Sequence, residues 1–191
     1  MNPSSALNLN IALIHYPVTN KNGEVIASAV TNLDLHDMAR SARTYGVKGF
    51  YVVTPLEDQQ ALAGKLVDHW VSGGGARYNP KRREAMQLVY IRDNLEQVVT
   101  EIGQAEGREP RTIVTCARPQ KGSVTYGELR QALSDGAPAL LLFGTAWGLA
   151  PDCLAAADII LDPVRGAGSY NHLSVRSATA IIVDRLCGEF K

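Results

Sequence analysis

The stretch PALLLFGTAWGLAPDCLAAADIILDP, residues 138–163, contains a complete strand–helix–strand pattern. The run at 138–145 is short and almost wholly apolar, which is typical of a strand buried on both faces of a sheet. APDCLAAAD at 150–158 predicts a short helix, and IILDP at 159–163 predicts a final strand. Strands that alternate with helices in this way pair in parallel, because the helix carries the chain back to the start of the next strand.

The same alternation continues outward from this stretch. Apolar runs predict strands at residues 9–18, 49–55, 86–91, 111–117, 138–145 and 159–163. Helical periodicity predicts helices at residues 33–46, 58–75, 94–107, 125–136, 150–158 and, after a glycine-bearing loop, within 166–186. The sequence therefore predicts a single α/β domain over residues 1–191, with a mostly parallel, doubly wound sheet of about six strands and helices on both faces.

Charge and composition restrict the class of protein. Lys plus Arg and Asp plus Glu number 19 each, so the net charge is zero, which argues against polybasic nucleic-acid binding but allows a local basic patch. No apolar run reaches the length of a membrane span, and the first residues lack the basic and apolar regions of a signal peptide. Cys116, Cys153 and Cys187 have no metal-ligand spacing. We expect a cytoplasmic protein without a metal site or membrane contact.

Several catalytic motifs are missing from the sequence. The segment after the first strand, YPVTNKNGE, has no G-x-G-x-x-G, which weakens a dinucleotide-binding interpretation. The chain also has no P-loop, no G-x-S-x-G nucleophile elbow and no H-E-x-x-H. His15 and His69 are interpreted as structural, and Cys116 as a small hydrophobic residue with a nucleophile as the alternative.

Three consecutive strand ends in the last third of the chain carry glycine-rich or polar loops. They are TCARPQKGS at 115–123, FGTAWGLAPD at 143–152 and LDPVRGAGSYNH at 161–172. In doubly wound folds, ligands bind beyond the carboxyl ends of the strands. Glycines there let main-chain groups approach a ligand such as an adenine nucleoside, so we predict a ligand site; three ordinary tight turns are the alternative.

The same residues resemble a known family. LLLFGTAWGLAPD followed by DIILDPVRGAGSYNHLSVRSATAIIVDRL is similar to the C-terminal half of the SPOUT superfamily of S-adenosylmethionine-dependent RNA methyltransferases. TNLDLHDMARSARTYGVKGFYVV resembles its N-terminal motif, and nearly the whole chain resembles a bacterial stand-alone group termed tRNA guanine-N1 methyltransferase-like. The resemblance implies a C-terminal trefoil knot, an exception to unknotted topology. It also implies a homodimer through the last helix, with the active site at the dimer interface.

The resemblance further implies which residues hold S-adenosylmethionine and release S-adenosylhomocysteine. Most contacts are expected from the main chain, with apolar side chains beside the adenine. The cofactor residues implied in this way are Cys116, Ala117, Phe143, Gly144, Thr145, Gly148, Leu149, Leu161, Pro163, Val164, Gly168, Tyr170, Asn171, His172 and Leu173.

The resemblance also implies a catalytic group of Arg40, Asn171 and Asp34. Arg40 matches the arginine of the N-terminal motif, whereas Asp34 stands where relatives have asparagine. In the last motif, His172 stands at the usual asparagine position and Asn171 precedes it. Asp34 has a capping carboxylate as its alternative role. The further candidates are His36 and His172 as base or orienting groups, and Arg165 for a phosphate or a developing oxyanion.

The segment ARYNPKRREA, residues 76–85, is interpreted as a basic loop. Cations beside an aromatic side chain are typical of surfaces that bind RNA, and a solvated helix start at Pro80 is the alternative. The predicted RNA-binding residues are Arg77, Tyr78, Lys81, Arg82 and Arg83, with Arg118 and Lys121 as an extension.

The last helix carries two apolar stripes rather than one. Val175, Ala178, Ile182 and Leu186 form the first stripe, and Leu173, Ala180, Val183 and Cys187 form the second. A surface helix needs one apolar face, so the second stripe predicts a partner, most simply a second copy of the chain. The predicted function is S-adenosylmethionine-dependent methylation of a tRNA or rRNA nucleotide; the alternative is a non-catalytic module of the same fold that binds RNA or the cofactor.

Overall fold

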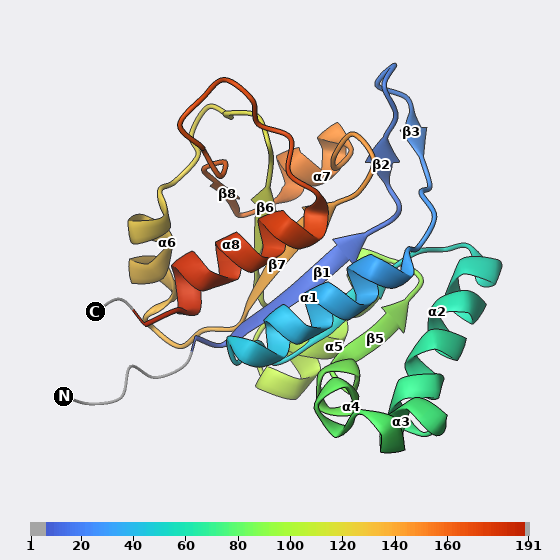
Figure 1. Cartoon of the computed structure of the whole chain (residues 1–191). Coiled ribbons are helices and arrows are strands. Elements are labelled where there is room, and N and C mark those ends of the chain that lie inside the picture. Colours follow the sequence, from blue (N-terminus) through green and yellow to red (C-terminus); the bar gives the residue numbers. More distant parts are fainter. Residues whose placement is uncertain (1–6, 190–191) are drawn as a thin grey trace.

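A six-stranded sheet runs through the centre of residues 7–189, which are the residues that the computed structural model describes (Figure 1). Its strands are β1 (Leu9–Ile14), β4 (Phe50–Val53), β5 (Val89–Arg92), β6 (Arg111–Thr115), β7 (Ala139–Gly144) and β8 (Ile159–Leu161). Their order is β5-β4-β1-β7-β6-β8, and each neighbouring pair is parallel. The predicted parallel α/β sheet is confirmed.

The centre of the sheet lies between β1 and β7. All six residues of β1 are buried, and Ile11 lies opposite Phe50 of β4 on one side and Leu141 of β7 on the other. Alternate residues of these strands join different apolar clusters, with Ile11 on one face and Ala12 on the other. A strand covered on both faces needs a continuous apolar run, which is the signal that the sequence carries at these positions.

Helices cover both faces of the sheet. On the face of Ile11 lie α1 (Asn32–Thr44), α2 (Glu57–Val71), α4 (Pro80–Met86), α6 (Tyr126–Leu133) and α8 (Val175–Cys187). On the opposite face lie α5 (Leu95–Glu106) and α7 (Pro151–Ala156). A short helix, α3 (Gly74–Tyr78), connects α2 to α4. No helix within residues 7–189 is long and apolar enough to cross a membrane.

The first predicted strand is too long. β1 ends at Ile14, and Pro17, which has no N–H for a sheet ladder, precedes a small antiparallel hairpin of β2 (Val18–Thr19) and β3 (Val25–Ile26). This hairpin projects beyond the sheet in Figure 1.

The predicted basic loop at 76–85 is also wrong. It is helical, because the Asn79 side chain accepts the Arg82 N–H as an N-cap and Pro80 occupies the first helical turn of α4. The third strand therefore starts at Val89 rather than at residue 86, which still belongs to α4.

The strand β8 is enclosed on both sides. β6 pairs with it on one side, and Val124 bridges to Leu161 on the other. The Val124 N–H donates to the Ile160 carbonyl at 2.8 Å, and the Asp162 N–H donates to the Val124 carbonyl at 2.9 Å. The chain from 116 to 123 therefore passes around the carboxyl end of β8. The trefoil knot implied by the resemblance stays a prediction.

Candidate functional site

Three loops follow the carboxyl ends of β7, β6 and β8, which are consecutive strands of the sheet. We call them the β6 loop (residues 116–123), the β7 loop (residues 145–150) and the β8 loop (residues 162–174). The Asn171 Nδ2 donates to the Ala117 carbonyl at 2.7 Å, which joins the β8 loop to the β6 loop. The edge of the sheet at which doubly wound folds bind ligands is therefore formed by the three segments that the sequence singles out.

The β7 loop is bound to the hairpin by main-chain hydrogen bonds. The Trp147 N–H donates to the Thr19 carbonyl at 3.0 Å, and the Thr19 N–H donates to the Gly148 carbonyl at 2.9 Å. Within the loop, the Gly148 N–H donates to the Thr145 carbonyl at 2.9 Å. Residues more than a hundred positions apart thus fix the conformation of this loop.

The turn after β7 depends on its glycines. A Cβ on Gly144 would lie 2.6 Å from the Leu149 nitrogen, because the chain folds back directly over this residue. Gly148 has φ +110°, and Ala146 has φ 50°, both in the left-handed region. The Trp147 side chain between them is 62% exposed. The loop is therefore a tight, glycine-dependent turn that presents an aromatic side chain to solvent.

A polar chain lies beneath the β7 loop. The Ser28 hydroxyl is hydrogen-bonded to His15 Nδ1 at 2.9 Å and to the Thr145 hydroxyl, which also donates to the Ile14 carbonyl at 3.0 Å. His15 is fully buried, and burial lowers its pKa to about 4, although the negative charge of Asp34 acts in the opposite direction. The neutral imidazole thus supports the loop, in agreement with the structural interpretation of His15.

The β8 loop has far fewer contacts. No backbone–backbone hydrogen bond within residues 7–189 involves residues 163–173. Tyr170 is 80% exposed and meets only the edge of the His172 ring, with the ring centroids 6.4 Å apart. Asp162 at the start of the loop is hydrogen-bonded to Ser123 and Val124, and Asn171 provides the hydrogen bond farther along it.

The predicted cofactor residues divide by exposure. The side chains of Phe143, Leu149 and Leu161 are buried in the protein core, so a ligand would reach only their main chain. Cys116 is half-buried, and its sulfur accepts a hydrogen bond from Gln120 at 3.5 Å. The residues whose side chains or main chain face solvent are Ala117, Gly168, Tyr170, Asn171, His172 and Leu173. The remaining members, which are buried or half-buried at the loop bases, are Gly144, Thr145, Gly148, Pro163 and Val164.

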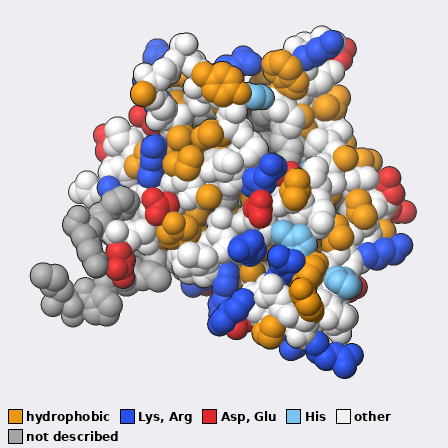
Figure 2. Space-filling view, viewed as in Figure 1, with side chains coloured by type: hydrophobic (Ala, Val, Ile, Leu, Met, Phe, Trp, Pro, Cys, Tyr) orange, Lys and Arg blue, Asp and Glu red, His pale blue; other side chains and the backbone are white. Residues whose placement is uncertain are grey.

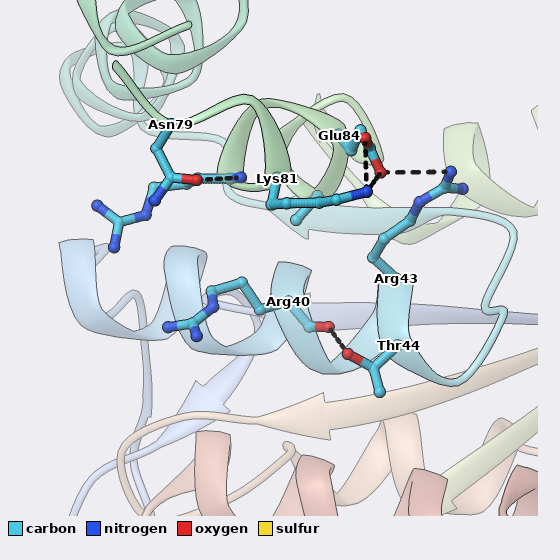
Figure 3. Close-up of a pocket in the computed structure, with 8 residues that line it drawn as sticks. Arg40, Arg43, Thr44, Asn79, Lys81 and Glu84 are labelled. Carbon is cyan, nitrogen blue, oxygen red and sulfur yellow. Dashed lines mark hydrogen bonds and ion pairs between the residues drawn. The ribbon is translucent and has the colours of Figure 1, made fainter. Parts of the chain in front are cut away.

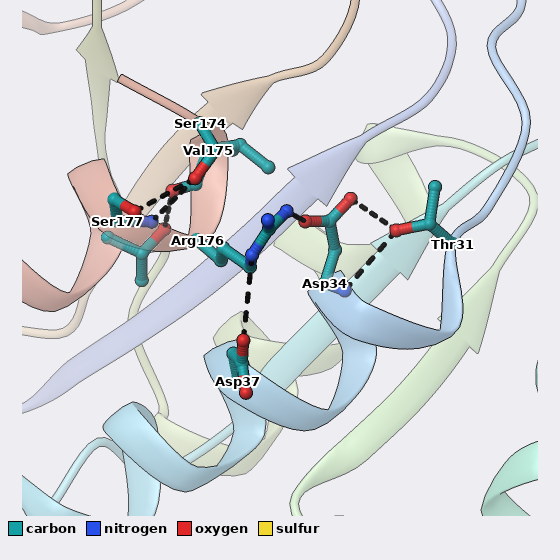
Figure 4. Close-up of polar contacts among 8 residues, drawn as sticks. Thr31, Asp34, Asp37, Ser174, Val175, Arg176 and Ser177 are labelled. Carbon is teal, nitrogen blue, oxygen red and sulfur yellow. Dashed lines mark hydrogen bonds and ion pairs between the residues drawn. The ribbon is translucent and has the colours of Figure 1, made fainter.

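Asp34 is engaged at both carboxylate oxygens (Figure 4). Thr31, the N-cap of α1, donates its hydroxyl to Asp34 Oδ2 at 2.6 Å. Arg176, in the first turn of α8, lies 3.2 Å from Asp34 Oδ1 and 3.5 Å from Asp37 Oδ2. This is the arrangement of the capping alternative, and it links α1 to the end of the β8 loop.

Arg40 lies apart from Asn171, on the side of α1 that faces α4. With Arg43 of the same helix it lines a hollow of about 260 Å³, which we call the α1–α4 groove (Figure 3). The other polar residues that line the groove are Asn79, Lys81, Arg82, Glu84 and Thr44. Within one chain, the predicted catalytic residues Arg40 and Asn171 are therefore not brought together.

Trp70 packs against Arg82, one of the residues that line the groove. The Arg82 guanidinium lies 4.4 Å from the centre of the Trp70 ring, and His36 and His69 meet that ring edge-on at 5.3 and 5.1 Å. Burial, and then the charge of Arg82, lower the pKa of His36. The His36 Nδ1 has no hydrogen-bond partner within residues 7–189.

The predicted RNA-binding residues fall in two places. Arg77 and Tyr78 lie exposed on α3, and Lys81, Arg82 and Arg83 follow on α4, next to the groove. Arg118 and Lys121 lie in the β6 loop, across the sheet from α4. They do not extend the α3–α4 patch, because β5 and β6 are separated by three strands.

The sequence analysis missed Arg43, Glu84, Ser28 and Arg176. The two groove residues lie on helices far apart in the sequence, so only packing of α1 on α4 brings them together. Ser28 carries no local signal. Arg176 carried one, since it is a charged residue in the first turn of a helix whose other charged residues, Asp184 and Arg185, lie near its end.

The second stripe of α8 is not an open face. Val183, which belongs to it, is fully buried in the chain, as are Ile182 and Leu186 of the first stripe. Leu173 is 43% exposed, and Ala180 and Cys187 are half-buried. The chain itself therefore covers part of both stripes, and the second partner of this helix stays a prediction.

Comparison with known proteins places the chain in a family. The sequence model of a family described as SAM-dependent RNA methyltransferase matches residues 8–188. A protein of Oleidesulfovibrio alaskensis named tRNA (guanine-N(1)-)-methyltransferase is 47% identical over 182 residues, which are 95% of this chain and 42% of that protein. An uncharacterized protein of Aquifex aeolicus is 41% identical over 180 residues, 94% of this chain and 88% of that protein. The chain thus spans less than half of the first of these relatives.

Solved structures agree with this assignment at the level of the fold. The A. aeolicus TrmH/SpoU tRNA modifying enzyme matches with a TM-score of 0.56 and 18% identity, over 96% of this chain and 75% of that chain. The chain belongs to the family of SAM-dependent RNA methyltransferases, and its fold is similar to that of the TrmH/SpoU enzyme.

Proposed function

We propose that the chain transfers a methyl group from S-adenosylmethionine to a nucleotide of a tRNA or rRNA. The observation that carries the proposal is the meeting of the β6, β7 and β8 loops at one edge of the sheet, with Asn171 bound to Ala117. The family match over residues 8–188 supports the same cofactor. We also propose that the protein acts in the cytoplasm, because a reducing environment keeps its three free cysteines reduced.

We expect the three loops to hold an adenine nucleoside. Gly148 and Gly168 have open space where a Cβ would be, so the main chain is accessible at these two positions. Main-chain groups there would bind the nucleoside, and half-buried apolar residues such as Val164 would flank its ring. When bound, the cofactor supplies an electrophilic methyl group on a sulfonium. The chain's contribution is to position the acceptor atom in line with that methyl and to exclude water.

The acceptor side of the reaction needs a second chain in this proposal. Arg40 and Asn171 are apart within one chain, and a homodimer that packs through α8 would bring Arg40 of one copy to the loops of the other. The half-buried Ala180 and Cys187 and the exposed Leu173 leave apolar surface for that contact. Arg40 would then neutralise negative charge at the acceptor, while Asp34 and Arg176 hold α1 against α8 as positioning residues.

A binding assay followed by a transfer assay tests the proposal. We expect calorimetry to detect binding of S-adenosylmethionine and S-adenosylhomocysteine, and labelled methyl groups to appear in unmodified RNA. Arg40→Ala is expected to abolish most turnover without lowering the melting temperature, because its side chain is exposed. Failure to bind either nucleoside would exclude the enzyme. Binding without transfer to total RNA would favour the non-catalytic module.

A further inference from the structure

The α1–α4 groove carries an excess of positive charge, although the net charge of the whole chain is zero. Arg40, Arg43, Lys81 and Arg82 line it with Glu84 as the one carboxylate, whereas the whole sequence balances 19 cations against 19 anions. Figure 2 shows Lys and Arg side chains gathered over α1 and α4 on this face. A local excess of this kind is a property of the site rather than of the composition, and it attracts an anion.

Glu84 pairs with two of the four cations of this surface. Lys81 Nζ lies 3.2 Å from its Oε1 and Arg43 Nη2 lies 4.0 Å from its Oε2, so the two cations reach it from opposite helices (Figure 3). All three side chains are at least 42% exposed. Exposed ion pairs of this kind contribute little stability, typically about 0–1 kcal/mol. The carboxylate is therefore easily exchanged for another anion.

The two remaining cations keep unused donors. Arg82 stacks on Trp70, and its Nε is buried and has no hydrogen-bond partner within residues 7–189, so a phosphate would bind the terminal nitrogens of this guanidinium. In the same described range, no hydrogen bond or ion pair engages the Arg40 guanidinium, while the Arg40 carbonyl accepts the Thr44 hydroxyl. Guanidinium groups held in this way are suited to phosphate oxygens, which they bind in a bidentate manner.

An exposed aromatic residue precedes the groove residue Asn79 in the sequence. Tyr78 lies two residues before Pro80, at which α4 begins. It is 85% exposed, more than any other large hydrophobic or aromatic residue within residues 7–189. A cationic groove next to a free aromatic ring matches the way in which proteins bind single-stranded or looped RNA, with phosphates on the cations and a base on the ring. An acidic peptide would use the cations but not the ring.

We propose that the α1–α4 groove binds the phosphate backbone of the substrate RNA, and that Glu84 is the internal anion that an RNA phosphate displaces. This inference rests on the proposed function, because it takes RNA as the substrate. The inference predicts opposite effects within one cluster. Removing the negative charge of Glu84 strengthens RNA binding, whereas removing its ion-pair partners Arg43 and Lys81 weakens it.

Fluorescence anisotropy with an unmodified tRNA transcript, without cofactor, tests the inference over a range of salt concentrations. Glu84→Gln is expected to lower the dissociation constant about threefold, since the phosphate no longer competes with the carboxylate. Arg43→Gln combined with Lys81→Gln is expected to raise it about tenfold and to reduce the salt slope by about two. Glu96→Gln, at an exposed position away from the groove, is the matched control for Glu84→Gln, and Arg108→Gln, also exposed and away from the groove, shows the effect of losing one cation elsewhere.

Each outcome decides the matter. The inference is overturned if Glu84→Gln binds RNA no more tightly than Glu96→Gln, if polyglutamate competes as well as RNA, or if the unaltered chain binds no RNA. The proposed function is judged separately, by cofactor calorimetry and methyl transfer. A chain that methylates RNA while the groove variants bind it normally would refute the groove alone, and a chain that binds RNA through the groove but no cofactor would refute the enzyme alone.

Discussion

The β7 and β8 loops leave the same edge of the sheet but are held in different ways. Trp147 and Gly148 of the β7 loop exchange main-chain hydrogen bonds with Thr19, whereas no backbone–backbone hydrogen bond within residues 7–189 reaches residues 163–173 of the β8 loop. The β7 loop therefore loses its conformational entropy when the chain folds. The β8 loop loses more of its conformational entropy when a ligand binds. Damage to the β7 loop is expected to lower stability, and damage to the β8 loop to lower cofactor affinity.

The sharpest way to break this comparison is a pair of glycine substitutions. Gly144→Ala puts a Cβ 2.6 Å from the Leu149 nitrogen, so the turn must move. We expect the free energy of unfolding to fall by about 3 kcal/mol, at the upper end for overpacking. Gly168→Ala, which meets nothing within 4 Å, is the control and is expected to change stability by less than about 0.5 kcal/mol. Equal losses in chemical denaturation would refute the difference between the loops.

A pH titration tests the support beneath the β7 loop. His15 has a pKa of about 4 in the folded chain, against 6.5 for an ordinary histidine, so below pH 6.5 the unfolded chain takes up a proton that folded His15 does not. The stability from this residue is complete at neutral pH and is expected to fall by about 2 kcal/mol between pH 7 and pH 5.

Urea denaturation at several pH values measures this loss. His15→Gln keeps a partner for Ser28 but has no titrating group, so the difference between the two pH profiles isolates the histidine. Profiles that run parallel from pH 7 to pH 5 would contradict the buried neutral state.

Asn171→Ala tests the hydrogen bond between the middle of the β8 loop and the β6 loop. Removing the hydrogen bond to Ala117 is expected to weaken S-adenosylmethionine binding about tenfold, the equivalent of about 1.4 kcal/mol. Its effect on unfolding is expected to stay below about 0.5 kcal/mol, because the loop is exposed. Calorimetry and thermal denaturation give the two values, with the neighbouring His172→Ala for comparison. A loss of stability without a loss of affinity would reverse the assignment of the two loops.

The smallest expected effect concerns the anchor at the end of the β8 loop. A double-mutant cycle of Asp34→Asn and Arg176→Gln is expected to give a coupling of about 0.5–1 kcal/mol, as for a partly exposed ion pair. Since Arg176 follows the β8 loop directly, the same variants are expected to raise the Michaelis constant for the cofactor more than they change the turnover number. Additive single effects would mean that the pair does not couple α1 to α8.

Much of the fold could be predicted from local sequence. Strands such as β1 and β7 are buried on both faces, so their residues form continuous apolar runs that need no knowledge of their neighbours. Residues 76–85 were interpreted as a loop, with a helix start at Pro80 as the alternative, because Asn79 and Pro80 usually mark a turn. The same pair is also an N-cap followed by a first-turn proline, and α4 begins in this way. One local signal thus had two valid interpretations, and packing on α1 selected between them.

The site was less accessible to sequence reasoning. Its loops could be found from their position after buried strands and from the family resemblance, but the contacts that shape them could not. The Thr19–Gly148 pair joins residues 129 positions apart, and the groove depends on side chains of α1 and α4 that no periodicity connects. Such contacts arise from topology, and a single sequence carries no local trace of them.

The strand order has a consequence for synthesis on the ribosome. β1 leaves the ribosome first and can pair with β4 and β5 as they follow, but its other edge belongs to β7, which begins at Ala139. An unpaired edge of buried apolar residues promotes association between chains. While the segment between β5 and β7 is translated, the edge of β1 that will pair with β7 is therefore unpaired. We expect the nascent chain to need a chaperone most during this interval.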